Sequence, residues 1–441
     1  MENSIFRSFI KYAGLNILGM IGVSCYILAD TFFISKALGA TGIAALNLSI
    51  SVYSVVHGIG LMLGIGGASR YSILLSQGKD KKANIVFTTA IKTGVAVGMI
   101  LMMIGVFGSN VISLALGADY TTLPLTRTYL TTILCFSPFL IINNILISFV
   151  RNDHNPKLSM LAMLVGSLSN IILDYVFMFP LKMGMFGAAI ATCLAPIISS
   201  SILLIHFTGR NHKLVFLNCR FIWSLLPDLF RLGLSALINE VSSAVVLITF
   251  NLVILGLEGN LGIAAYGIGA NIALVVIAVF TGLAQGIQPL ISYYYGLRKD
   301  KQLRRIRNYA YVASFFIALI IYLGVLFYVD QVIAIFNSEN HKVIELLAKR
   351  GLEIYFLGFF FAGVNIITAM YLSATEAARD AFLISISRGL VVIVPLVFLL
   401  SRIWNMDGVW LSFVLTELIV TVLAITLIHA RRNRSIFKQE S

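Results

Sequence analysis

The sequence predicts an all-α membrane protein with twelve transmembrane helices in two six-helix lobes, related by a parallel pseudo-twofold repeat. Hydrophobic residues make up 59% of the 441 residues and charged residues only 12%, whereas soluble globular chains carry about 25% charged residues. Apolar runs of about 20 residues, long enough to cross a bilayer as a helix, recur along the whole chain. Strands of about ten residues with alternating polarity, which mark a membrane barrel, are not seen.

The apolar runs give the order and approximate bounds of the spans. Glycines are frequent in the second and eighth spans and indicate close packing of helices through small residues; helix bending is the alternative. We expect the spans at residues 10–38, 43–68, 84–107, 124–150, 157–179, 187–208, 226–256, 261–291, 308–329, 348–373, 379–401 and 407–430.

An internal repeat divides the chain into two halves. Three short motifs recur at a nearly constant offset: GIAA at 42–45 and 262–265, KDK at 79–81 and 299–301, and MxG at 185–187 and 406–408. Six spans per half give the two halves the same orientation, as in transporters built from parallel repeats. We therefore expect an N-terminal six-helix lobe at 1–210, a cytoplasmic linker at 211–225 and a C-terminal six-helix lobe at 226–441.

The distribution of charge predicts the orientation in the membrane. The formal net charge is +13, and the basic residues concentrate in the even-numbered loops and the C-terminal tail. Because basic loops stay inside, we expect a multi-pass protein of the inner (plasma) membrane with both termini cytoplasmic. Anionic lipid headgroups are the expected partners of these charges, and nothing resembles a nucleic-acid-binding module. We expect a monomer, with its four isolated cysteines as free thiols.

Asp30 is the first candidate functional residue. It lies within the first span, in the run ILADTFFI, far from either end. An acid at that depth costs about 3 kcal/mol on insertion scales, so its carboxylate must be protonated, paired with a cation or facing an aqueous cavity. The alternative is a buried aspartate that only bonds to a neighbouring helix.

A second acid, Asp174, indicates a cation site together with Asp30. Asn170 stands four residues before Asp174, and Tyr26 four before Asp30, so each pair shares a helix face. The predicted topology puts both acids and Thr192 at similar depth in the outer half of the bilayer. Two carboxylates, an amide oxygen and a hydroxyl suit a proton or Na⁺ better than a soft metal. The alternative is a satisfied hydrogen-bond network between helices.

Glu240 is the candidate for binding an organic substrate. It lies mid-span in the second half, beside Asn239, and the matching position in the first half carries no acid. A single carboxylate on a cavity wall can pair with an organic cation, with aromatic and methionine side chains adding affinity of low specificity. The alternative is a buried glutamate bonded to Asn239 or to the backbone.

Together, these motifs resemble the multidrug and toxic compound extrusion (MATE) transporters, most closely their DinF-like branch. The resemblance covers essentially the whole chain. It rests on ADT at 29–31, QGK at 77–79, NxxxD at 170–174, GAAIAT at 187–192 and QGxQP at 285–289. Two departures stand out: the first proline is Pro124, whereas many relatives have one in the first span, and the tenth span has no acid within 364–370.

The resemblance implies roles for the polar residues. Asp30, Asn170, Asp174 and Thr192 would bind the coupling cation and would be the ligands of Na⁺ if that is the ion, while Tyr26 and Asn144 would join their hydrogen-bond network. Glu240 would match the family's glutamate in the seventh span. The missing proline argues against bending of the first span, and the missing acid argues against coupling through the second lobe.

The function predicted is secondary antiport, without enzymatic activity or a cofactor other than the coupling ion. The protein would export amphipathic, often cationic organic compounds in exchange for H⁺ or Na⁺. A lipid-linked oligosaccharide flippase of the same superfamily is the first alternative, and it would favour a basic cavity. A membrane-embedded polymerase or acyltransferase is the second, but the loops are short and the histidines scattered.

Overall fold

The computed structural model describes residues 2–209, 212–336 and 342–437, and these ranges form helices and their connections without a strand. The α-helices are α1 Glu2–Ser76, α2 Asp80–Ala115, α3 Leu123–Cys135, α4 Ser137–Asn152, α5 Pro156–Met178, α6 Gly184–Leu204, α7 Leu226–Gly296, α8 Asp300–Phe336, α9 Lys342–Tyr355, α10 Phe359–Ala374, α11 Ala378–Ile386 and α12 Ile393–Phe437. Short 3₁₀ turns lie at Ile205–Thr208, Trp223–Leu225 and Phe356–Gly358, and a π-helical turn at Ser387–Val391.

Backbone breaks divide the longest helices into pairs of spans. In the described ranges, nine apolar helical stretches are long enough to cross a membrane when α3 and α4, bent by 53°, count as one. Three of the nine contain a break with positive φ, at Gly39 in α1, Gly259 in α7 and Asn405 in α12. Each of these three forms a hairpin of two spans, so the described chain crosses the membrane twelve times, as predicted.

The backbone also repeats between the two halves. Left-handed conformations, which few residues other than glycine adopt, recur at offsets of 220 to 222 residues. The pairs are Gly39 and Gly259, Gly78 and Arg298, His154 and Glu376, and Gly184 and Asn405. Because the same turns close the same connections in both halves, the fold consists of two six-helix lobes with the same architecture.

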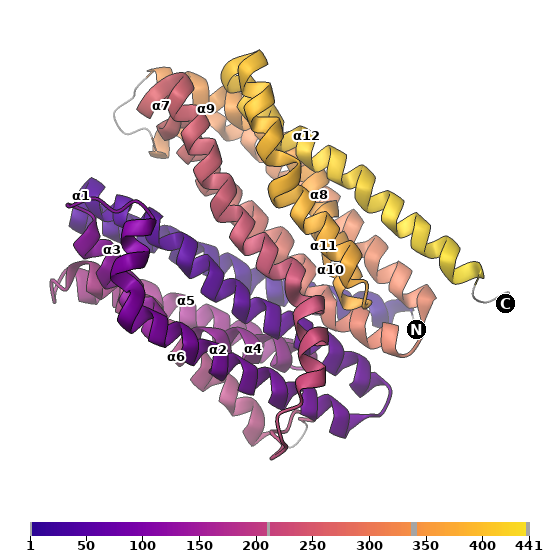
Figure 1. Ribbon diagram of the computed structural model, residues 1–441. Coiled ribbons are helices and arrows are strands. Elements are labelled where there is room, and N and C mark those ends of the chain that lie inside the picture. The colour runs from indigo at the N-terminus through magenta and orange to yellow at the C-terminus, as the bar shows by residue number, and fades with distance from the viewer. Residues whose placement is uncertain (1, 210–211, 337–341, 438–441) are drawn as a thin grey trace.

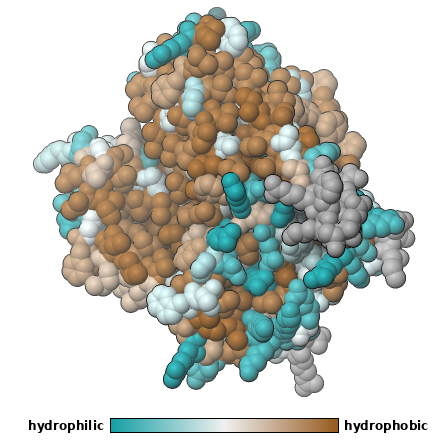
Figure 2. All heavy atoms as spheres, turned by 45° about the vertical axis from the view of Figure 1, so that its right-hand side comes forward, coloured by the Kyte–Doolittle hydropathy of each residue, from teal (hydrophilic) through white to brown (hydrophobic). Residues whose placement is uncertain are grey.

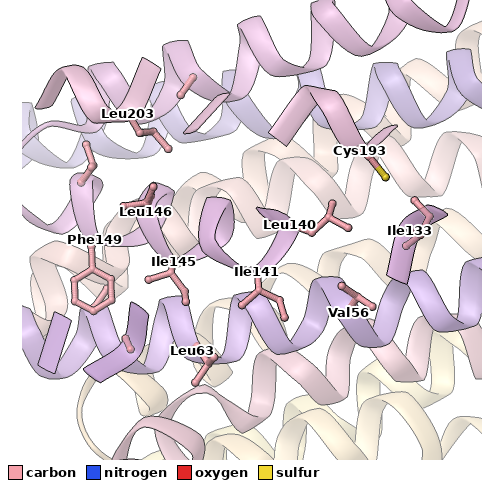
Figure 3. Packing of buried hydrophobic residues seen from close by; sticks show 14 of the residues in the cluster. Val56, Leu63, Ile133, Leu140, Ile141, Ile145, Leu146, Phe149, Cys193 and Leu203 are labelled. Carbon is pink, nitrogen blue, oxygen red and sulfur yellow. The ribbon is translucent and has the colours of Figure 1, made fainter. Parts of the chain in front are cut away.

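Each lobe has its own hydrophobic core. In Figure 3, side chains from α1, α3, α4 and α6, among them Leu63, Ile133, Ile145 and Leu203, meet inside the first lobe. Figure 1 shows the lobes close together near the termini and spread apart toward the ends labelled α1 and α7. We call the end with both termini the terminal side and the other end, with the breaks at Gly39 and Gly259, the distal side. Hydrophobic residues cover broad areas of the surface (Figure 2).

The lobes touch through glycines that allow backbones to meet. A Cβ on Gly66 would lie 2.2 Å from the Leu229 carbonyl oxygen, and one on Gly233 would lie 1.9 Å from the Met62 carbonyl oxygen. A Cβ on Gly282 would lie 2.8 Å from the Ile17 Cα atom. Close packing through small residues, predicted for the second and eighth spans, is therefore confirmed at Gly66 and Gly282.

A layer of buried polar side chains joins the lobes on the terminal side. Asn152 and Gln288 exchange hydrogen bonds, and Gln288 also reaches Ser69 and Ser292. Arg151, which the predicted span bounds place in the loop between 150 and 157, instead belongs to this layer. It is 1% exposed, and it donates to Asn16 and Gln285. We call this layer, made of Asn16, Ser69, Arg151, Asn152, Gln285, Gln288 and Ser292, the polar seam.

The segment between the lobes is fastened to the first lobe by Asp153. Its carboxylate accepts hydrogen bonds from the backbone N–H groups of Lys213 and Leu214 and from the Tyr71 hydroxyl, and it lies 2.8 Å from His206 Nε2. Burial alone would raise the pKa of Asp153, but the hydrogen bonds from His206, Tyr71 and the backbone outweigh burial and lower that pKa. Of the predicted linker 211–225, residue 211 lies outside the described residues.

We expect Asp153→Asn to destabilise the protein in a pH-dependent way. The lowered folded-state pKa means that the carboxylate stabilises the fold above its unfolded pKa of about 3.9, and that this contribution disappears as the pH falls. Loss of charged hydrogen bonds costs about 1.5 to 3 kcal/mol at neutral pH. Thermal unfolding in detergent should therefore separate wild type from variant at pH 7, and this gap should be smaller at an acid pH below the unfolded pKa. An equal gap at both pH values would contradict this role; Glu258→Gln, an exposed carboxylate beside the distal break in α7, is the control.

Candidate functional site

Helices α1 and α5 lie side by side and position the two predicted acids. Toward the terminal side, Gly19 and Gly22 of α1 pack against Met163 and Leu164 of α5. Toward the distal side, the Phe33 ring lies 6.3 Å from the Tyr175 ring. Asp30 and Asp174 fall between these two levels of contact, and their carboxyl groups are close enough to interact electrostatically.

The acids and their amide neighbour are buried without hydrogen-bond partners. Asp30 is 7% exposed, and Asn170 and Asp174 are 0% exposed. Within the described chain, Asp30 Oδ1, both carboxylate oxygens of Asp174 and both polar atoms of the Asn170 amide have no hydrogen-bond partner. Buried polar atoms are almost always paired, since leaving one unpaired costs free energy. Several unpaired oxygens in one place fit a bound proton or hard cation.

Thr192 approaches the acid cluster from α6. Next to Thr192 lies Tyr129 of α3, which was not predicted from the sequence as a site residue. The Tyr129 hydroxyl lies close to the Thr192 side chain and interacts electrostatically with Asp30 and Asp174. Thr192 Oγ1 donates to the Ala188 carbonyl. The only available signal for Tyr129 was an aromatic residue with a hydroxyl among the threonines at the start of the fourth predicted span, which is too common to single it out.

Tyr26 joins the acid cluster to a polar chain that ends at Asn144. Tyr26 interacts electrostatically with both acids, and its hydroxyl lies 3.1 Å from the Tyr53 hydroxyl. The Tyr53 ring stacks on His57, with ring centroids 5.8 Å apart, and His57 Nδ1 lies 3.2 Å from Asn144 Nδ2. Asn144 is thus linked to Asp30 through three aromatic residues.

A small cavity lies where this row of polar side chains meets the second lobe. Its volume is about 100 Å³, and four of the predicted residues line it: Tyr26, Asn144, Thr192 and Glu240. Asp30, Asn170, Asp174 and Asn239 do not line it. A drug-sized ligand needs about 300 Å³ or more. The cavity in this conformation therefore has room for water or an ion between the acid cluster and Glu240.

Other charged residues within the spans have structural partners. Glu417 is 1% exposed and bonds Arg388 and the Asn365 amide of its own lobe. Lys92 extends to the terminal side and donates to the Cys219 carbonyl. In the described ranges, no three residues of the types His, Cys, Asp and Glu lie close enough together to hold a metal ion. As far as the described residues go, the buried carboxylate oxygens without a hydrogen-bond partner belong to Asp30 and Asp174.

We expect Tyr129→Phe to weaken cation binding while leaving the fold intact. The variant keeps the ring but removes the hydroxyl that lies beside Thr192 and the two acids. Losing one polar interaction of about 1 kcal/mol should lower the affinity roughly fivefold. The measurement is the concentration of H⁺ or Na⁺ that gives half-maximal efflux from proteoliposomes. Unchanged ion dependence would exclude Tyr129 from the site; Tyr175→Phe, on the distal side of the acids, is the matched control.

Two parallel six-helix lobes with buried acids and a cavity between them define the architecture of a helical membrane transporter. A family model described as MatE matches residues 16–176 and 236–399. The chain belongs to this family, which confirms the predicted resemblance; the DinF-like branch stays a prediction.

Similar proteins extend over nearly the whole chain. It is 27% identical over 439 residues to a protein of Staphylococcus saprophyticus named "Multidrug export protein MepA", covering 98% of this chain and 95% of that one. A protein of the same name from Staphylococcus aureus is also 27% identical, with the same shares covered. A solved structure described as the outward-facing conformation of a MATE family transporter superposes with a TM-score of 0.91 at 22% identity, covering 98% and 96% of the two chains.

Proposed function

We propose that this membrane protein is a secondary antiporter that exports amphipathic, often cationic organic compounds in exchange for H⁺ or Na⁺ entering the cell. The observation that carries the proposal is the cluster of unpaired buried oxygens on Asp30, Asn170 and Asp174. Membership of the MatE family and the multidrug-export names of its relatives support the choice of substrate. The proposal includes no catalytic residue and no cofactor beyond the coupling ion.

In this proposal the first lobe carries the coupling ion. The ion enters from the distal, extracellular side, and the oxygens of Asp30, Asn170, Asp174 and Thr192 bind it. Neutralising the carboxylates removes charge from a low-dielectric interior, which favours a rearrangement of the first lobe and release of the substrate. Tyr26 and Asn144 transmit the change along the chain of hydroxyl, imidazole and amide groups.

The second lobe supplies the substrate's counter-charge. Glu240 lines the cavity and pairs with a cationic substrate, and Asn239 next to it provides further polar contact when the lobes move. The polar seam holds the terminal, cytoplasmic side closed in the present conformation, so it must separate for substrate to enter. We retain the division into lobes at 1–210 and 226–441 with a linker at 211–225, a monomer in the plasma membrane and both termini cytoplasmic.

The cavity lining also argues against the flippase alternative. A lipid-linked oligosaccharide carries phosphate groups and would require cationic side chains in its binding site. In the described chain, the lining contains the Glu240 carboxylate and no lysine or arginine. A cavity lined by a carboxylate favours a cationic substrate.

A proteoliposome assay with separate ion gradients tests the proposal. The purified protein is reconstituted with a fluorescent organic cation inside, and a pH gradient or a Na⁺ gradient of equal size is applied alone. One gradient should drive efflux above the rate without a gradient, and dissipating it with an ionophore should remove the effect. Efflux that is equal under all three conditions would refute antiport.

A further inference from the structure

The second lobe contains a much larger cavity at its terminal end, away from the acid cluster. Its volume is about 700 Å³, and it opens among the ends of α7, α8, α10, α11 and α12. Five arginines line it, against three carboxylates: Arg231, Arg304, Arg307, Arg379 and Arg431, with Asp300, Glu376 and Asp380. Both the size and the excess of guanidinium groups are suited to an anionic ligand.

The carboxylates leave most of this positive charge available. Asp380 is paired with Arg431 at 3.5 Å, and Glu376 is paired with Arg70, which belongs to the first lobe. Arg307 lies over the rings of Tyr371 and Tyr311, at 5.4 and 5.8 Å from their centroids. In the described ranges its buried Nε has no hydrogen-bond partner.

The repeat shows what occupies the equivalent place in the first lobe. There, the Asn84 side chain bonds the backbone of Lys213 and Val215, and Thr88 Oγ1 accepts from the Leu217 N–H group. The chain's own linker thus covers the terminal end of the first lobe. At the offset of 220 residues, Asn84 corresponds to Arg304 and Phe87 to Arg307.

The two lobes therefore differ in what they can bind at this end. Asp153, which fastens the linker, corresponds to Thr375 at the offset of 222, so the second lobe lacks the carboxylate that binds backbone N–H groups. The second lobe has arginines where the first lobe has an amide and a phenyl ring. In the part of the chain that the structure describes, the matching space is an open cavity.

We propose that this arginine-lined cavity binds a phosphate group. Guanidinium groups bind phosphate oxygens through paired, charge-assisted hydrogen bonds, and a phosphate would supply the acceptor that Arg307 Nε lacks. The phosphate is that of an anionic phospholipid headgroup or inorganic phosphate. Basic pockets between helices at the cytoplasmic side bind such headgroups in other membrane proteins. This binding does not depend on the transport cycle.

The test measures binding by the full-length protein in neutral detergent. Thermal stability is followed during titration with cardiolipin, with phosphatidylcholine and with inorganic phosphate at constant ionic strength. Cardiolipin should stabilise wild type where phosphatidylcholine does not, and Arg307→Gln should weaken its apparent affinity at least about tenfold. Stabilisation by millimolar inorganic phosphate as well would assign the site to any phosphate, and stabilisation by lipid alone would assign it to headgroups.

Two further variants keep the proposal falsifiable. Arg304→Gln, on the exposed rim of the cavity, changes no buried contact and should also weaken binding, so it replaces Arg307→Gln if that variant misfolds. Lys299→Gln removes an equally exposed charge from the adjacent loop but does not line the cavity. If all three variants lost the same affinity, the binding would depend on general surface charge and the proposal would be overturned. Absence of binding by the wild type would also overturn it.

Discussion

Asp30→Asn is expected to abolish ion-driven export and to reduce efflux to the rate measured with protein-free liposomes. The amide cannot take up a proton, and it removes one of the two negative charges that attract a cation to the buried cluster. Removing an ionisable group from the middle of a span also removes its insertion cost, about 2.5 to 3.5 kcal/mol for aspartate. The variant should therefore insert normally and unfold at the same temperature as wild type or higher. Loss of transport with retained stability is the signature of a functional acid.

Glu417→Gln is the matched control, because it removes a buried acid that has a structural role. Glu417 is buried as deeply as Asp30, but its carboxylate is paired with Arg388 and Asn365. Removing its charge leaves the Arg388 guanidinium without its buried partner, so stability should fall by about 3 to 5 kcal/mol. The ion dependence of the remaining efflux should be unchanged. Wild-type export by Asp30→Asn, or loss of coupling in Glu417→Gln alone, would contradict the proposed division between coupling and structural acids.

The fold followed from the sequence because its signals are local. Apolar runs set the spans, and the repeat of KDK at 79–81 and 299–301 reflects turns that recur in the backbone at Gly78 and Arg298. The structure also shows Asp30, Asn170 and Asp174 on adjacent faces of α1 and α5. Spacing of four residues was enough to predict which of their side chains share a helix face.

The residues that the sequence analysis misplaced depend on contacts between distant segments. Arg151 lies in a basic stretch that also carries Lys157, and hydropathy gives no reason to separate the two. Only the closure of α4 against α1 and α7 buries Arg151 against Asn16 and Gln285. Tyr129 was likewise missed because its partner Thr192 lies 63 residues away, on a helix whose rotation the sequence does not define.

The polar seam and the glycines around it predict a second large effect, from Gly233→Ala. The added Cβ would lie 1.9 Å from the Met62 carbonyl oxygen and 2.7 Å from the Met62 Cα atom. Backbone cannot rotate away as a side chain can, so the clash is relieved only by moving α7 away from α1. Overpacking of this kind costs about 1 to 3 kcal/mol, which shifts the ratio of closed to open terminal sides by roughly 5- to 150-fold. Export should fall because the terminal side no longer closes firmly.

Alkylation of a single cysteine at Ser72 measures this shift directly. Ser72 is buried at the lobe contact, where its hydroxyl donates to the Pro289 carbonyl. With the four native cysteines replaced, Ser72→Cys should react about tenfold faster or more when combined with Gly233→Ala. Gly256→Ala is the control: it lies on the same helix with nothing within 4 Å of its added Cβ, and alanine there favours helix by about 1 kcal/mol. If Ser72→Cys reacted at the same rate with and without Gly233→Ala, the α1–α7 contact would tolerate the methyl group. Closure of the terminal side would then depend on the polar seam alone.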